Sequence, residues 1–146
     1  MRVTGSIRTA TRWLSCSAFA FTLAGCVTRT TTYYKPTEGE PRLNQDEFRQ
    51  ASDQLLKVEC PRLMGSGSSA TGQARIRVSY DRSGAVQQSQ ILRSSGDERI
   101  DTEWGALTAR LQFDAQEGQT EDLRAGILTV GYSCAPNTAV TTLQLP

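Results

Sequence analysis

The clearest hydrophobic pattern in this sequence is the alternation of apolar and polar residues over 73–80, QARIRVSY. Because side chains of a strand alternate between two faces, this segment predicts a strand with one buried face. The positions expected to be buried are Ala74, Ile76, Val78 and Tyr80. Residues 81–84, DRSG, predict a turn in which Gly84 is free to adopt a positive φ. The apolar residues of 85–93 do not alternate strictly, which predicts a returning strand with a bulge and hence an antiparallel hairpin.

Residues 44–58 carry apolar side chains at spacings of three and four, which predicts a helix with one apolar face. The residues of that face are Phe48, Ala51, Leu55 and Val58. Asn44 and Glu47 have the spacing of a capping box at the start of this helix. Because the residue before a proline avoids the helical conformation, we expect the helix to end at Cys60-Pro61.

Residues 94–113 predict a second helix, because large apolar side chains recur there along one stripe. The stripe consists of Ile100, Trp104, Leu107 and Leu111. Either Ser95 together with Glu98, or Asp101 by itself, can cap the start of this helix. Acidic residues also gather in its first turns, where they either complement the helix dipole or form a carboxylate site. This acidic set is Asp97, Glu98, Asp101 and Glu103.

A third strand is predicted over 123–133, where apolar residues alternate again. Its expected inward positions are Leu128, Val130 and Tyr132. We expect GSGSSATG at 65–72 to be a flexible connector and 135–146 to be a loose C-terminal tail. The element order α-β-β-α-β then predicts an α+β domain over 44–134, with a three-stranded antiparallel sheet packed by helices on one face. In this arrangement the third strand lies at an edge of the sheet.

The N-terminal residues 1–25 have the pattern of an export signal peptide, with three arginines followed by the apolar run 13–24. The following motif, LAGC at 23–26, resembles the bacterial lipobox, in which the cysteine is lipidated and becomes the new N-terminus. The resemblance implies acyl chains, palmitate among them, on Cys26, and Val27 is similar to the default signal for sorting to the outer membrane. We therefore expect a periplasm-facing outer-membrane lipoprotein of the bacterial cell envelope. The alternative is an ordinary signal peptide that is cleaved nearby.

The attachment point is expected to be followed by a flexible tether, because residues 26–43 are rich in threonine and lack a helical stripe. Of the remaining cysteines, Cys16 leaves with the signal peptide. Cys60 and Cys134 are then an even pair in an oxidising compartment, and we predict a disulfide between them. A redox-active pair is the alternative, although the sequence has no C-x-x-C motif.

Charge and composition exclude several classes of function. The net charge is +1, and it falls to −2 when residues 1–25 are removed, which gives no electrostatic basis for binding nucleic acid. The absence of histidine excludes catalysis by Ser-His-Asp or Cys-His nucleophiles and most zinc sites. We therefore expect no enzyme activity, no cofactor or metal and no small-molecule substrate.

The order of short motifs over 61–133 resembles the C-terminal domain of TonB-type energy transducers, a fold of the TonB and TolA type. The residues that carry the resemblance are the strand positions Ile76, Val78 and Tyr80, the turn residues Asp81 and Gly84, the returning strand residues Val86, Ile91 and Leu92, the strand end Ser94, Ser95 and Gly96, and the helix residues Ile100, Asp101 and Phe113. The sequence departs from that family at Cys60-Pro61, where a Tyr-Pro pair is common. It also lacks the transmembrane helix and the long proline-rich spacer of members that transduce energy.

The resemblance implies that a strand edge pairs with a short peptide of a protein partner. The expected edge residues are Leu123, Ile127, Leu128, Thr129, Val130 and Tyr132. The partner is then a TonB-dependent receptor or another outer-membrane or periplasmic protein, in support of TonB-dependent transport. The alternatives are an edge covered by the tail or by the Cys60 segment, and a structural or assembly lipoprotein that reuses the fold. Arg75, Arg77 and Arg93 form a basic row on the outward strand face, which either meets an acidic partner or is simply solvated.

Overall fold

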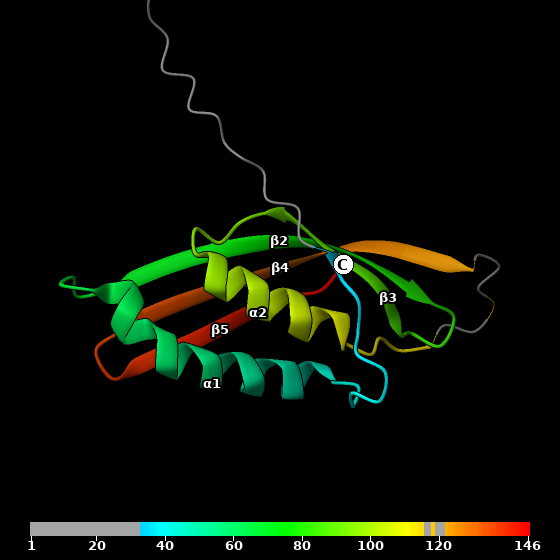
Figure 1. The fold of residues 1–146 in the computed structure, drawn as a ribbon, viewed down its shortest axis with the longest axis horizontal. Helices are drawn as coiled ribbons and strands as arrows, with labels where there is room; N and C mark the ends of the chain where they lie inside the picture. The colour runs from blue at the N-terminus through cyan, green and yellow to red at the C-terminus, as the bar shows by residue number, and fades with distance from the viewer. Residues whose placement is uncertain (1–32, 116–117, 119–121) are drawn as a thin grey trace, which may run out of the picture.

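The computed structural model describes residues 33–115, 118 and 122–146, so the predicted signal peptide and Cys26 lie outside the described residues. The described chain forms a five-stranded antiparallel sheet with two helices, which confirms the predicted α+β class (Figure 1). Along the chain the elements are β1 (Tyr33–Tyr34), α1 (Gln45–Met64), β2 (Ala70–Asp81), β3 (Val86–Arg93), α2 (Glu98–Ala109), β4 (Leu123–Ala135) and β5 (Thr138–Gln144). The strand order in the sheet is β1-β3-β2-β4-β5.

Both helices pack against one face of the sheet, α1 over β4 and β5 and α2 over β3 (Figure 1). The inward positions of β2 and β4 are buried as their alternation predicts, and they form a single core with the helices. The largest fully buried side chains of this core are Trp104, Phe48, Leu56, Ile76, Ile100, Leu111 and Leu128. Within the described residues no helix covers the opposite face of the sheet.

The sheet has two strands more than the three predicted. Residues 138–144 form β5, so the prediction of a loose tail over 135–146 is wrong. Asn137 turns the chain with a φ of 63°, a conformation that asparagine adopts more readily than most residues. Tyr33 and Tyr34 form β1 against β3, so this part of the predicted tether belongs to the folded unit.

The first helix differs from its prediction in both its end and its buried face. It begins at the Asn44–Glu47 capping box as predicted, but it continues through Pro61. Pro61 is exposed, so water can reach the backbone carbonyl that loses its helical partner there. The buried face runs through Phe48, Ser52, Leu56, Glu59 and Cys60, whereas Val58 is 75% exposed. The buried face includes the polar residues Ser52 and Glu59, so the pattern of apolar residues alone did not identify it.

The second helix buries Ile100 and Trp104 of its predicted stripe, but it begins at a different cap and is shorter than the predicted 94–113: it ends at Ala109, and Leu111 instead forms a bridge with Leu43. The side chain of Asp97 accepts hydrogen bonds from the backbone N–H groups of Arg99 (3.2 Å) and Ile100 (3.1 Å). The predicted caps, Ser95 with Glu98 or Asp101, are not used. The buried side chain of Asp101 instead accepts a hydrogen bond from the backbone N–H of Ser95, at 2.9 Å.

The β2–β3 hairpin has the predicted turn and bulge. The register shifts between Ser79 and Tyr80, and Gly84 has a φ of +86°. A Cβ atom at Gly84 would clash with the carbonyl oxygen of Phe113. The absence of a side chain at Gly84 therefore lets the chain after α2 approach the turn closely.

A disulfide joins Cys60 to Cys134, as predicted, with an S–S distance of 2.06 Å. It links the last turns of α1 to the end of β4, and both cysteines are buried in the core. As for membrane crossing, neither of the helices in the described part of the chain has the length and apolarity that a span requires.

Candidate functional site

The face of the sheet that points away from the helices presents three arginines. Arg75 and Arg77 lie at successive outward positions of β2, and Arg93 lies on β3. All three are exposed, and Arg75 is the direct register partner of Arg93. Like charges placed directly opposite on one face of a sheet destabilise it. We call this surface the open face; its predicted basic row is present.

Apolar side chains are interspersed with these arginines. The register aligns Tyr33 of β1, Gln90 of β3, Arg77 of β2 and Ile127 of β4 in one row across the sheet. Tyr33 is 69% exposed and Ile127 36%. Leu123 and Val140 occupy outward positions at other points of the face and are also exposed. The open face therefore combines cationic and apolar contacts.

The six residues predicted to form a binding edge do not form one surface. Leu128, Val130 and Tyr132 point into the core, and Thr129 pairs with Gln144 of β5. The prediction that 123–133 lies at the sheet edge is wrong for its second half, because β4 lies between β2 and β5 there. Leu123 and Ile127 remain accessible on the open face.

The first part of β4 extends beyond the end of β5. Pairing between the two strands begins at Thr129 opposite Gln144, whereas pairing with β2 continues to Leu123. We call residues 123–128 the β4 overhang. Within the described chain no strand pairs with the outer side of the overhang. Pro146 lies beneath it, close to Gly126.

The two outermost strands are partly closed along their edges. Asp53 of α1 accepts a hydrogen bond from the backbone N–H of Thr141 at 2.9 Å, in the middle of β5. On the other side, β1 pairs with Ser89 and Gln90 in the middle of β3. These contacts occupy backbone groups at the centre of each edge, whereas β4 pairs with no strand on its outer side over residues 123–128 within the described chain.

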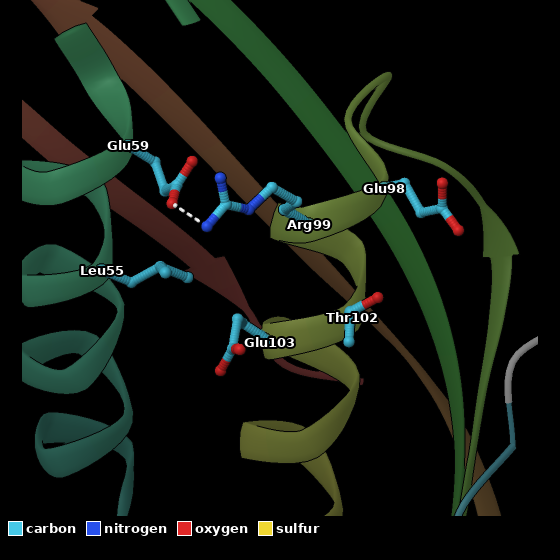
Figure 2. Close-up of a pocket in the computed structure, with 6 residues that line it drawn as sticks. All are labelled: Leu55, Glu59, Glu98, Arg99, Thr102 and Glu103. Carbon is cyan, nitrogen blue, oxygen red and sulfur yellow. Dashed lines mark ion pairs between the residues drawn. The ribbon is translucent and has the colours of Figure 1, made fainter. Parts of the chain in front are cut away.

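A groove between α1 and α2, with a cavity of about 300 Å³, is the second candidate. Its lining consists of Leu55, Glu59, Glu98, Arg99, Thr102 and Glu103. Figure 2 shows Glu59 and Arg99 pointing toward one another across the groove, whereas Glu98 points away from it. The Arg99 guanidinium lies 3.3 Å from the Glu59 carboxylate, which is nearly buried.

The charged residues of this groove are engaged with one another. Arg62 lies 2.6 Å from the Glu59 carboxylate and 2.8 Å from that of Asp97. These two hydrogen bonds raise the pKa of Arg62, and the bond from Arg62 holds the pKa of Asp97 below its usual value. The pairs fasten the end of α1 to the start of α2, which is a structural role.

The predicted acidic set of α2 is dispersed by these contacts. Asp97 caps the helix, Asp101 is buried against Ser95, and Glu103 lines the groove. In the part of the chain that the structure describes, no three Cys, Asp or Glu side chains gather to hold a metal ion. The i, i+3 spacing of Glu59 and Arg62 was a signal for the ion pairs, but it needed a helix that continues past Pro61.

Comparisons with protein-family models, with curated proteins and with solved structures find no match to this chain.

Proposed function

We propose that this chain is a lipid-anchored protein-binding module of the bacterial envelope that pairs with an extended segment of a partner along the β4 overhang. The proposal combines the signal and lipobox pattern, the TonB-like order of motifs over 61–133 and the geometry of the sheet. The partner class that the resemblance implies is a TonB-dependent receptor or another outer-membrane or periplasmic protein.

The observation that carries the proposal is the direction of the backbone groups in the overhang. Successive residues of an antiparallel strand direct their N–H and C=O groups to alternate sides. The N–H of Thr141 turns away from β4 to reach Asp53, so its register partner Tyr132 directs its groups toward β2. The residues of β4 at odd-numbered positions therefore direct theirs toward the β5 side.

The same alternation continues into the overhang, because the register with β2 has no shift there. Leu123, Ala125 and Ile127 thus direct their N–H and C=O groups to the side where β5 has ended. Unpaired groups of this kind bind an added strand through main-chain hydrogen bonds. Leu123 and Ile127 also offer exposed apolar side chains to alternate residues of that strand.

Replacing Ala125 with proline tests this geometry, because the one backbone donor that proline removes is the N–H that points outward. Ala125 does not use its N–H to pair with β2, and proline is tolerated in strands where the N–H faces solvent. The experiment places a photo-reactive residue at Leu123 in the full-length chain and identifies the proteins crosslinked in the envelope. Ala125→Pro should abolish the crosslinks, and the control Ala125→Val should keep them.

The same envelope proteins crosslinked to Ala125→Pro as to Ala125→Val would overturn strand pairing at the overhang. Thermal unfolding of the oxidised protein checks that both variants fold. A photo-reactive residue at Val140 on β5 gives the positional control, since it lies on a strand that is already paired to β4 and contacted by α1.

A further inference from the structure

We infer that the open face binds an acidic, partly apolar polypeptide segment, with carboxylates received by Arg75, Arg77 and Arg93. The inference rests on the proposed function, since it states the chemistry of the same partner. It uses the side chains of the face, whereas the pairing proposed above uses the backbone of the β4 overhang.

The arrangement of the arginines supports an anionic ligand. Arg75 and Arg93 are direct cross-strand partners, and Arg77 follows Arg75 on the same face. The repulsion within this group is relieved when a carboxylate lies between the guanidinium groups. Guanidinium forks also match the planar geometry of a carboxylate better than an ammonium group does.

The three arginines have no carboxylate partner among the described residues. The ion pairs of the described chain involve Arg49, Arg62, Arg82 and Arg99. Asp81, at the end of β2, is the one carboxylate at a described outward position of β2, β3, β4 or β5.

Asp81 is engaged by its own turn and by Gln87 at the start of β3. It accepts hydrogen bonds from the backbone N–H groups of Ser83 (2.9 Å) and Ala85 (3.1 Å), from the Ser83 hydroxyl (2.6 Å) and from the Gln87 amide (2.7 Å). A carboxylate held in this way does not reach back to Arg75 or Arg77. Among the described residues, the positive charge of the open face is therefore not neutralised by a carboxylate.

The neighbours of the arginines favour a polypeptide as that partner. Arg77 lies in a row between Gln90 and the exposed apolar side chain of Ile127, with Tyr33 at the far end. A segment that mixes acidic and apolar residues complements both kinds of contact. Ile127 also belongs to the β4 overhang, so its exposed side chain lies on the open face next to the backbone where the partner strand would pair.

A binding measurement with defined peptides tests the inference. The probe is a fluorescent peptide in which glutamates alternate with leucines, and its control has glutamines in place of glutamates. The variant is Arg75→Gln with Arg77→Gln, and its matched control is Arg49→Gln with Lys57→Gln, which removes the same charge from the exposed side of α1. We expect the face variant to bind the glutamate peptide about tenfold more weakly, and the α1 variant to bind it normally.

Equal binding of the glutamine peptide, equal loss in both charge variants or no binding of the glutamate peptide would overturn the inference. Displacement of the glutamate peptide by an equal concentration of an acidic muropeptide would also overturn the inference. That result would show that the arginines bind carboxylates of the cell wall. Failure of the two proposals is separable. If Ala125→Pro keeps all crosslinks while the Arg75→Gln, Arg77→Gln variant loses peptide binding, only the pairing proposal fails. If Ala125→Pro loses the crosslinks while the arginine variant still binds the peptide, only the present inference fails.

Discussion

Asp97 has two roles at one position. Its carboxylate caps α2 and forms an ion pair with Arg62, which belongs to α1. The hydrogen bond from Arg62 is the main reason why the pKa of Asp97 lies below its usual value. A carboxyl group whose pKa is lower in the folded protein stabilises the fold at neutral pH, and this stabilisation is lost as the pH falls through the folded pKa.

Substitutions at Asp97 separate the two roles. Asn is as good an N-cap as Asp but carries no charge, whereas Ala loses both functions. We expect Asp97→Ala to lower the free energy of unfolding by about 1 kcal/mol relative to Asp97→Asn. Both variants should lose less stability than the native chain as the pH falls below roughly 4, where aspartate is protonated in unfolded chains.

Urea unfolding at a series of pH values measures both effects. If Asp97→Asn keeps the full acid dependence of the native chain, the ion pair with Arg62 does not contribute to it. The pH dependence of stability that remains in the Asp97 variants should come from groups such as Asp81. The pKa of Asp81 is lowered chiefly by its hydrogen bond with the Ser83 hydroxyl.

The structural role of a single residue was predictable from the sequence where it depends only on neighbouring positions in the chain. The buried positions of β2, the positive φ of Gly84 and the Asn44–Glu47 cap follow from short patterns. Asp97 was missed as a cap because several polar residues around it fit the same rule. Arg62, which distinguishes Asp97 from them, lies 35 positions away in the chain.

At the scale of the elements, β5 is held from both sides. It pairs with β4 along one edge, and the Asp53 carboxylate of α1 accepts the N–H of Thr141 on the other. The strand has no charged residue and no proline, which are common protections of an exposed edge. Asp53 therefore takes the place of such protection at the centre of β5.

Removing the Asp53 carboxylate should expose the β5 edge. We expect Asp53→Ala to lower the free energy of unfolding by about 1–3 kcal/mol, because the partly buried N–H of Thr141 loses its acceptor. We also expect self-association through paired β5 edges, measured by light scattering during gel filtration. Asp53→Asn keeps an acceptor oxygen and should stay close to the native behaviour. A monomeric Asp53→Ala variant of unchanged stability would contradict this role.

The elements with strong periodicity were predictable, and those completed by distant contacts were not. Two residues, Tyr33 and Tyr34, are too few to show any alternation, so β1 is defined only by its pairing with β3. In β5 the inward positions are Ala139, Thr141 and Leu143, and a threonine among them weakens the apolar signal. The end of α1 was predicted too early, because proline is tolerated where its helix face is exposed.

For the whole molecule, the layered α+β arrangement follows from one hairpin and two amphipathic helices. The candidate site was only partly predictable from the sequence, because the edge of a sheet is set by whichever segment forms its outermost strand. Once residues 138–144 join the sheet, the accessible part of the predicted edge shrinks to the β4 overhang. The outward direction of Arg75 and Arg77 needed only the local alternation of β2.

Anchoring is a prediction for the full chain. If Cys26 is lipidated, several acyl chains hold the protein on the membrane, at about 0.8 kcal/mol for each buried methylene. Cys26→Ala should therefore release the protein from the membrane fraction or leave it unprocessed. Cys16→Ala is the matched control and should remain anchored. Intact mass determines the N-terminus, and an unmodified N-terminus elsewhere in the native chain would disprove lipidation.

The Cys60–Cys134 bridge also determines how this molecule carries mechanical load. A pull on the β4 overhang against the N-terminal side travels along β4 to Cys134, crosses the sulfur atoms to Cys60 and continues through α1. Residues 61–122, which include β2, β3 and α2, lie outside this covalent path. Tension therefore bypasses the central hairpin, whereas in the reduced protein the same pull would run through it and stretch it open.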